Sequence, residues 1–145
     1  MQNLRVPEQL RRHDATQATL DRFRGKEFSW SAGITCVHLA RFHLRRMGHK
    51  VEPLPRFYSA IGASRALKER GWAGCADMLD AQPGLVRIPP MAMRMGDLAV
   101  LDSEDGVGGV MICAGPHKLF GWREDVPDLI VLDVDFSDLC GAWRV

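Results

Sequence analysis

The sequence has no long apolar run and almost no excess of charge of either sign. Its 145 residues include 19 Lys and Arg and 18 Asp and Glu, which gives a formal net charge of +1 at pH 7. A nearly neutral chain offers no electrostatic reason to bind nucleic acid or an anionic membrane surface. No stretch approaches the roughly 20 apolar residues of a membrane-spanning helix. Residues 1–8 lack the apolar core of a signal peptide, so we expect synthesis in the cytoplasm.

The sequence also lacks closely spaced metal-binding side chains. Its four cysteines, Cys36, Cys75, Cys113 and Cys140, are far apart and include no Cys-X-X-Cys pair. That spacing argues against a zinc ribbon and, in a cytoplasmic chain, against a disulfide framework. The five histidines are equally scattered. We therefore expect no metal ion and no cofactor.

What is present is an ordinary globular composition, with 46% hydrophobic and 26% charged residues. A chain of this length supports one domain with a real core, so we predict a single domain over residues 1–145. Helical patterns fill the first part, about residues 7–82, and short apolar runs typical of strands fill the second, about residues 85–145. This order predicts an α+β fold, with N-terminal helices packed on a C-terminal antiparallel sheet.

The individual elements follow from apolar spacing and from the residues that interrupt it. We expect helices over residues 9–24, 36–47, 59–70 and 75–81, with a second helix start at Asp14 as an alternative for the first. We expect strands over residues 86–88, 95–101, 110–114, 118–122 and 129–134, and an ordered end over residues 138–145 that contains Trp143.

The most strongly patterned stretch is residues 28–48. Thr35 is a suitable N-cap for a helix that begins at Cys36, and Gly48 is a suitable end. A thiolate at a helix start is stabilised by free amides and by the helix dipole, so Cys36 is a candidate nucleophile. The alternative is that Cys36 is a small buried apolar residue, as free cysteines usually are. We expect the Trp30 ring to pack on the helix start and Gly33 to permit a tight turn.

Several short motifs, spread from about residue 28 to the end of the chain, carry a family resemblance. They are Phe28-X-Trp30, Cys36 at the start of a helix, Tyr58 ahead of Ala63-X-X-Ala66-Leu67, Gly96-Asp97-Leu98-Ala99, Gly109-Val-Met-Ile and Ala142-Trp143-Arg144-Val145. Together they resemble the NlpC-type cell-wall peptidases, which have a papain-like fold. More closely, the chain is similar to an NlpC-like family encoded among the tail genes of tailed phages and prophages. The resemblance gives Trp30, Gly33, Tyr58 and Asp97 structural roles around the site of Cys36.

The chain departs from the pattern of the active peptidases at two positions. They carry Asp-Cys at the helix start where this chain has Thr35-Cys36, and a histidine at the start of the strand after the Gly-Asp motif. Here Val107 or Gly108 stands where that base is expected. Without an imidazole in reach, a cysteine is expected to keep a pKa near ~8.5 and to be a poor nucleophile.

Other histidines offer few replacements for the missing base. His38 is expected to point away from Cys36 around the helix, and His43 lies ~10 Å along the helix axis. His13 and His49 fall in polar segments where a solvated role is expected. His117, in the turn after the strand that should carry the base, is the one serious candidate for a displaced base.

These observations lead to three hypotheses. The favoured one is a structural component of a phage tail tip or baseplate, synthesised in the host cytoplasm and then built into the virion. Its partners would be other phage tail proteins, with bacterial peptidoglycan as a further partner. Trp122 and Trp143 are candidates for contact with a partner, and the alternative, which is commoner for tryptophan, is that both belong to the core. The alternative is an active cysteine peptidase or amidase that degrades peptidoglycan during phage entry, with Cys36 as nucleophile and His117 as base. An unrelated cytoplasmic binding module is the third.

Overall fold

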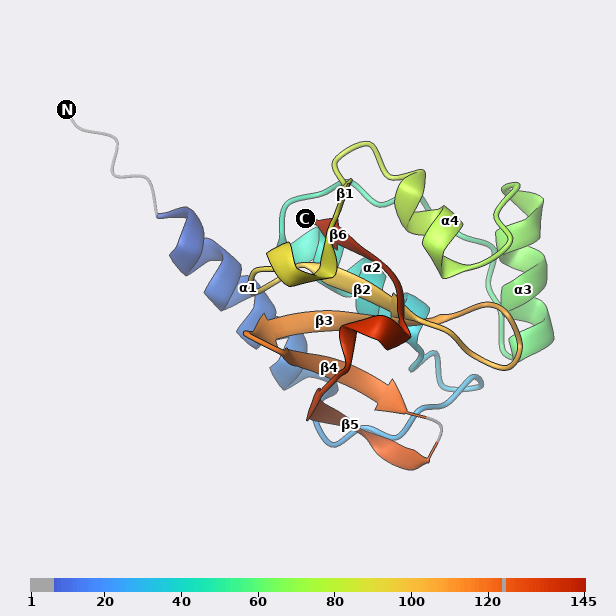
Figure 1. Cartoon of the computed structure of the whole chain (residues 1–145). Coiled ribbons are helices and arrows are strands. Elements are labelled where there is room, and N and C mark those ends of the chain that lie inside the picture. Colours follow the sequence, from blue (N-terminus) through green and yellow to red (C-terminus); the bar gives the residue numbers. More distant parts are fainter. Residues whose placement is uncertain (1–6, 124) are drawn as a thin grey trace.

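Four helices precede the sheet in the chain. The computed structural model describes residues 7–123 and 125–145, so residues 1–6, for which we expect no signal peptide, lie outside the described residues. The helices are α1 (Glu8–Phe23), α2 (Cys36–Arg46), α3 (Ala60–Glu69) and α4 (Cys75–Asp80). In Figure 1, α1 and α2 lie behind the sheet, while α3 and α4 stand beyond one end of its strands. The α2 helix therefore carries Cys36 directly against the sheet.

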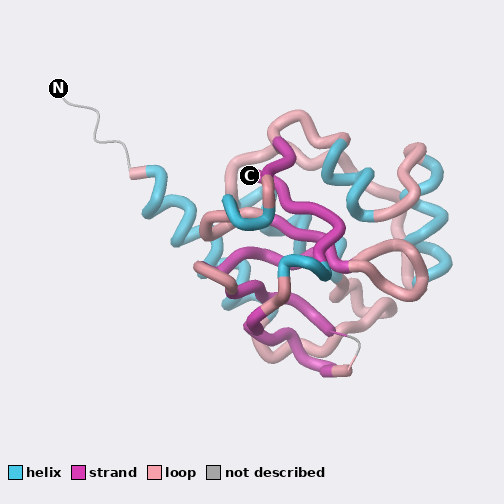
Figure 2. Tube along the Cα trace, viewed as in Figure 1, coloured by secondary structure: helices cyan, strands magenta, loops and turns pink. Residues whose placement is uncertain are grey.

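All six strands form one antiparallel sheet. They are β1 (Val86–Ile88), β2 (Leu98–Leu101), β3 (Gly109–Gly115), β4 (Lys118–Arg123), β5 (Val126–Asp133) and β6 (Leu139–Arg144). Their order is β1-β6-β2-β3-β4-β5, and every neighbouring pair is antiparallel. The last strand of the chain thus lies inside the sheet, next to β2. Figure 2 shows the strands crossing in front of the helices, with two short helical turns on the opposite side.

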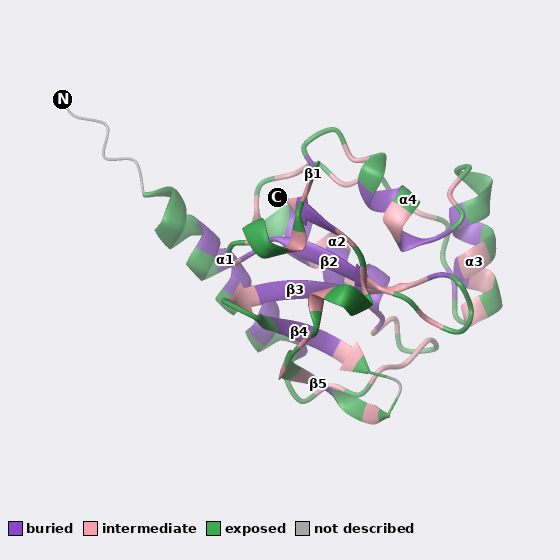
Figure 3. Cartoon of the chain, in the orientation of Figure 1, coloured by how far each residue is buried: buried purple, intermediate pink, exposed green. Residues whose placement is uncertain are grey.

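The two faces of the sheet contact different elements. Alternate residues of β2 and β3, among them Val100 and Ile112, join the main core with α2 and Trp143. The residues between them, including Met111 and Cys113, form a smaller cluster on the other face. Side chains alternate between faces along a strand, so this division follows directly from the sequence. Figure 3 shows the buried residues concentrated along the central strands.

The predicted α+β fold and the order of helices and strands are confirmed. The first segment forms one continuous helix, and the alternative start at Asp14 is wrong because Arg12, Thr16 and Thr19 pack inward across that point. Trp143 is fully buried, which confirms the core alternative for this residue and excludes a contact role for its side chain. Within the described residues, no helix is both long and apolar enough to cross a membrane.

Candidate functional site

The N-terminus of α2 holds Cys36 at the edge of the main core. Thr35 caps the helix as predicted, because its side-chain oxygen accepts a hydrogen bond from the backbone N–H of His38. This cap fixes the first turn and therefore the direction of the Cys36 side chain. The residue is 9% exposed, so its thiol is almost closed off from solvent.

The loop between β2 and β3 lies over this thiol. The Sγ atom of Cys36 lies 3.9 Å from the carbonyl oxygen of Gly108, and Val107 beside it is buried. The loop is held internally, because the Gly108 amide donates to Ser103 Oγ and the Val107 amide donates to Asp105 Oδ1. A backbone carbonyl therefore stands where the resemblance predicts an imidazole.

No side chain can be placed at position 108 without rearrangement. Gly108 has a φ of +85°, and a Cβ atom there would lie 2.8 Å from Val100 Cγ1 and 3.3 Å from the carbonyl oxygen of Leu101. A histidine would meet both the left-handed backbone and this close packing. The backbone conformation at position 108 therefore favours glycine and excludes a histidine in this arrangement.

A second cysteine, which the sequence reasoning did not connect with the site, lies beside the first. Cys75 begins α4, is fully buried, and its Sγ lies 3.6 Å from the same Gly108 carbonyl oxygen. Its backbone N–H donates a 2.7 Å hydrogen bond to the carbonyl oxygen of Val107. Gly74 permits this close approach, because a Cβ there would lie 2.7 Å from the Val107 oxygen.

The two thiols shift each other's pKa values in opposite directions. When Cys36 ionises, the Cys75 thiol can donate its proton to the Cys36 sulfur, and this hydrogen bond lowers the pKa of Cys36 against the effect of burial. The same hydrogen bond, together with burial, raises the pKa of Cys75 well above its usual value. The neighbouring thiol thus supplies Cys36 with a hydrogen-bond donor that the sequence analysis did not identify.

None of the five histidines, all of which are described, forms a hydrogen bond with Cys36. The His38 ring packs against Phe57, and its Nδ1 lies 2.7 Å from Thr35 Oγ1. Burial lowers the pKa of His38, with Arg41 adding to the effect. The His43 ring is fully buried between α1 and the start of β2, as described below. Neither imidazole is placed to take a proton from the Cys36 thiol.

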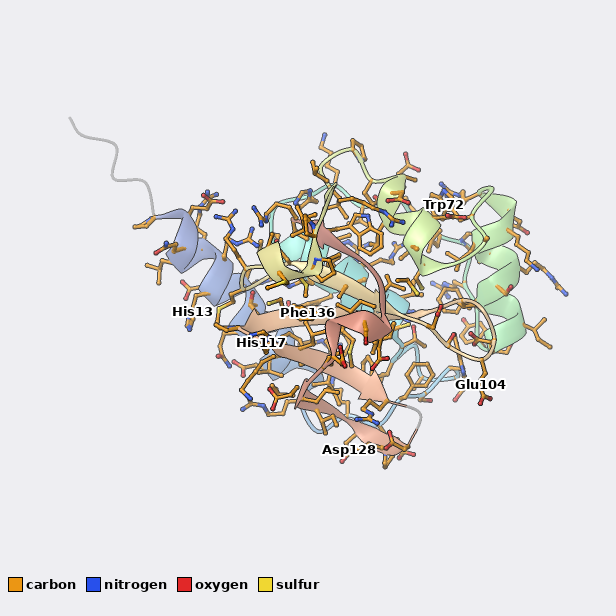
Figure 4. The ribbon with its side chains drawn as sticks, viewed as in Figure 1. His13, Trp72, Glu104, His117, Asp128 and Phe136 are labelled. Carbon is orange, nitrogen blue, oxygen red and sulfur yellow. The ribbon has the colours of Figure 1, made fainter. Side chains whose placement is uncertain are left out.

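The structure separates His117 from Cys36. The residues 116–117 form the turn after β3, whereas Cys36 meets the chain just before β3 begins at Gly109. The seven residues of β3 span about 20 Å at ~3.3 Å per residue. The His117 ring stacks on Phe136, at a centroid distance of 5.3 Å. Figure 4 shows these two side chains together, with Glu104 of the β2–β3 loop far to the other side.

Around the Cys36 end, the aromatic packing only partly follows the sequence expectation. Trp30 is half-buried and makes edge contacts with Phe28 and Phe57, and Gly33 adopts the predicted positive φ of +70°. Tyr58 is 61% exposed, whereas its neighbour Phe57 is buried against His38 and Trp30. A local pattern could not distinguish two adjacent aromatic residues in a loop.

Asp97 lies at the opposite end of the strands from Cys36. Its carboxylate is fully buried, and both oxygens have several donors. Oδ1 accepts from Arg12 Nη2 at 2.6 Å and from the Val145 amide at 3.1 Å. Oδ2 accepts from Arg144 Nε at 2.9 Å and from the Arg94 amide at 2.8 Å. The Gly96-Asp97 motif thus joins α1, the turn before β2 and the last strand.

His43 extends this network into the main core. Its Nε2 lies 2.8 Å from the carbonyl oxygen of Gly96, which can only accept, so Nε2 carries the proton. The Nδ1 atom, 2.9 Å from Thr19 Oγ1, then accepts from that hydroxyl. Burial, which outweighs the Gly96 hydrogen bond, lowers the pKa of His43 to about 4. This histidine is a neutral structural residue at neutral pH.

Among the described residues, no three His, Cys, Asp or Glu side chains gather in a way that could hold a metal ion. A groove of about 680 Å³ runs between α3 and the β2–β3 loop, next to Val107. Charged residues of both signs line it, including Arg65, Lys68 and Asp105. The site therefore contains two thiols, Cys36 and Cys75, without a neighbouring imidazole base, and an open groove lies beside it.

Comparisons with solved structures identify the fold as that of NlpC/p60 domains. The chain is similar to RipD of Mycobacterium tuberculosis, described as a non-catalytic NlpC/p60 domain protein adapted to peptidoglycan binding. Identity is 18%, the match covers 92% of this chain and 97% of RipD, and the TM-score is 0.58. The P60 domain of an antigen from M. avium paratuberculosis matches at 19% identity over 94% of this chain and 95% of that domain, with a TM-score of 0.56.

The peptidoglycan hydrolase RipB of M. tuberculosis is also similar, at 15% identity over 96% of this chain and 68% of RipB, with a TM-score of 0.61. No curated protein matches the sequence. Residues 9–145 match a single family, described as a domain of unknown function. By that match over nearly its whole length, the chain belongs to the family DUF6950.

Proposed function

We propose that this chain is a structural component of a phage tail tip or baseplate, built on an NlpC/p60 fold without peptidase activity. It is synthesised in the host cytoplasm and then incorporated into the virion, where its partners are other tail proteins. The support for the tail role is the resemblance of its motifs to an NlpC-like family encoded among phage tail genes. The support for a non-catalytic role comes from the geometry at Cys36.

One observation carries the non-catalytic part of the proposal: the carbonyl oxygen of Gly108, and no imidazole, faces the Cys36 thiol. A cysteine peptidase needs a base that takes the thiol proton and later gives it to the leaving amine. A carbonyl oxygen can accept a hydrogen bond but carries no proton to transfer. The Cys75 thiol is a donor to Cys36, and because its pKa is raised it already holds its own proton at neutral pH and cannot accept the proton of Cys36.

Binding of peptidoglycan is a second candidate function, and the likeness to RipD favours it because RipD is described as non-catalytic and peptidoglycan-binding. The groove between α3 and the β2–β3 loop could accept an extended peptide. The α3 side of its lining includes exposed Ile61 and the charged residues Arg65, Lys68 and Glu69, and the loop side includes Asp105. Cell-wall peptides carry both amine and carboxylate groups, which such a lining can pair.

The tail role is tested in the phage or prophage that encodes the chain. We expect mass spectrometry of purified particles to detect the protein, and a deletion to abolish tail assembly. Cys36→Ser supplied in trans should restore both assembly and infectivity. Normal particles that no longer infect would point instead to a peptidase that acts during entry, and absence of the protein from particles would contradict the structural role.

The binding role is tested with purified protein and insoluble peptidoglycan. We expect the protein to sediment with the peptidoglycan without releasing soluble fragments or new amine groups. Arg65→Glu combined with Lys68→Glu should weaken sedimentation, whereas the same reversal at the distant surface pair Arg45 and Arg46 should not. Equal sedimentation of both variants would exclude the groove, and release of fragments would restore the enzyme hypothesis.

A further inference from the structure

Two buried thiols meet at one point in the fold although 38 residues separate them in the chain. Cys36 is the first residue of α2 and Cys75 is the first residue of α4. Their sulfur atoms lie 3.9 and 3.6 Å from the same acceptor, the carbonyl oxygen of Gly108. Both sulfurs therefore lie beside the same carbonyl oxygen, close enough for a hydrogen bond between the thiols, and two adjacent thiols can be oxidised to a disulfide.

We propose that Cys36 and Cys75 form a redox pair, which closes an intramolecular disulfide when the protein meets a hydroperoxide. This inference goes beyond the proposed function. It needs neither a tail partner nor a cell wall, so its test is independent of that proposal.

The chemistry follows from the different surroundings of the two sulfurs. Cys36 is the attacking thiolate, because the hydrogen bond from Cys75 and the backbone amides of Val110 and Val37 stabilise its negative charge. It attacks one peroxide oxygen and the O–O bond breaks, which gives a sulfenic acid on Cys36 and a hydroxide. The hydroxide takes the proton of Cys75 and leaves as water, and the Cys75 thiolate formed in this way attacks the Cys36 sulfur. The S–O bond breaks and a second water leaves.

The overall step is balanced. Two thiols lose two electrons and two protons, the hydroperoxide is reduced, and the products are the disulfide and two waters when the oxidant is hydrogen peroxide. Only a small oxidant such as hydrogen peroxide can reach the thiols, because Cys36 is 9% exposed and Cys75 is fully buried. A dithiol reductant reverses the reaction by thiol–disulfide exchange.

The other two cysteines are not placed to compete. Cys113 is on the opposite face of the sheet, in the small cluster with Met111 and Leu119. Cys140 is exposed on β6, where its thiol donates a 2.9 Å hydrogen bond to Asp102 Oδ1. Burial and this carboxylate raise the pKa of Cys140 to about 11, so it holds little thiolate at neutral pH. Both cysteines serve as internal controls.

The disulfide would join the starts of two helices across a long loop. Cross-linking a loop of about 40 residues restricts the unfolded chain, and we expect a rise in melting temperature of roughly 10 °C on oxidation. The cross-link would also consume both thiols at this site. Oxidation would thus stabilise the fold and leave no free thiol at residues 36 and 75.

The experiment treats the full chain with a small excess of hydrogen peroxide and follows intact mass, peptide maps without reductant, and melting temperature. We expect a mass loss of two hydrogen atoms per chain, a cross-linked peptide pair containing residues 36 and 75, and full reversal by dithiothreitol. Cys36→Ser and Cys75→Ser should each abolish the cross-link and the thermal shift, while Cys140→Ser should keep both.

Three results would overturn the proposal. One is a stable mass gain from sulfinic or sulfonic acid on Cys36 of the unmutated chain, with Cys75 still alkylatable after unfolding. Another is a cross-link that involves Cys113 or Cys140. The third is a mapped Cys36–Cys75 disulfide that forms only after the protein is unfolded in urea. Because these readouts use the unmutated protein, they do not depend on the serine variants folding.

Discussion

The two ends of the central strands bury different polar groups, a carboxylate at one end and a pair of thiols at the other. At one end, Asp97 is a buried charge whose two oxygens are satisfied by two guanidinium groups and two backbone amides. At the other end, two thiol groups lie against one carbonyl oxygen, and a glycine occupies the position of the expected base. The first end joins distant segments of the chain, and the second brings two thiols together at one backbone carbonyl oxygen.

This difference separates what a motif does for the fold from what it does for chemistry. The Gly96-Asp97 motif is part of the resemblance to the NlpC-type peptidases. In this chain the Asp97 carboxylate lies at the start of β2, and the thiols lie near the other end of that four-residue strand. A chain can therefore keep this part of the pattern for stability alone. Motifs at the Asp97 end indicate the fold, and only residues at the Cys36 end bear on activity.

The largest expected effect comes from removing the charge at the first end. Asp97→Ala leaves Arg12 buried without its partner, so we expect a loss of about 3–5 kcal/mol in the free energy of unfolding. Urea titration followed by circular dichroism measures it. The matched control is Asp133→Ala, which breaks the exposed pair with Lys118 and should cost less than about 1 kcal/mol. Similar losses in both variants would mean that burial at Asp97 contributes nothing.

The same end should make stability depend on pH through His43. Its pKa is about 4 in the folded chain and 6.5 when unfolded. The unfolded chain therefore binds the proton first, and stability falls as pH drops from about 6.5 to about 4, by about 3 kcal/mol in total. We expect His43→Gln to flatten the slope of unfolding free energy between pH 5 and 6.5, where carboxylates contribute little. The exposed control His13→Gln should leave that slope unchanged.

At the Cys36 end, aromatic packing should contribute less than a fully buried ring would. Trp30 is half-buried against Phe28 and Phe57, so we expect Trp30→Ala to cost about 2 kcal/mol, below the ~3–5 kcal/mol typical of buried aromatic truncations. Tyr58→Ala, at a 61% exposed aromatic position in the same region, should stay within about 0.5 kcal/mol. Denaturant melts that rank the two variants in the reverse order would show that the loop is held by Tyr58.

The smallest expected effect is a shift in the pH midpoint of Cys36 alkylation when its neighbour Cys75 is replaced. In a Cys140→Ser background, the rate of Cys36 alkylation by iodoacetamide should follow its ionisation as pH rises. Cys75→Ala removes the hydrogen-bond donor, so the pKa of Cys36 should rise and the midpoint should move to higher pH. His117→Ala should not move it. A midpoint that shifts with His117 and not with Cys75 would restore the displaced-base hypothesis.

Local sequence patterns predicted most of the elements but little of their arrangement. The cap at Thr35, the left-handed Gly33 and the strands around residues 98–101 and 110–114 follow from short-range rules. The position of β6 between β1 and β2 does not, because pairing of antiparallel strands depends on side-chain packing across the whole sheet.

At the candidate site, the sequence showed that the histidine base is missing but did not show that Cys75 lies beside Cys36. The absence of histidine at residues 107–109 was readable directly. The meeting of Cys36 with Cys75 was not, since it depends on where α4 docks against the β2–β3 loop. One local sign did exist, because each cysteine directly follows a residue suited to begin a helix, Thr35 or Gly74. That pattern marks two helix starts without saying that they adjoin.

The position of β6 between β1 and β2 makes residues 139–144 decisive for folding during biosynthesis. Arg12 donates hydrogen bonds to Asp97 and to the carbonyl oxygen of Val145, and β2 pairs with β6 along its length. Until residues 139–145 have left the ribosome, β2 has an open edge and α1 lacks part of its anchor. Contacts of such long sequence separation form late and slowly. The part of the nascent chain that precedes β6 should therefore stay protease-sensitive until β6 emerges.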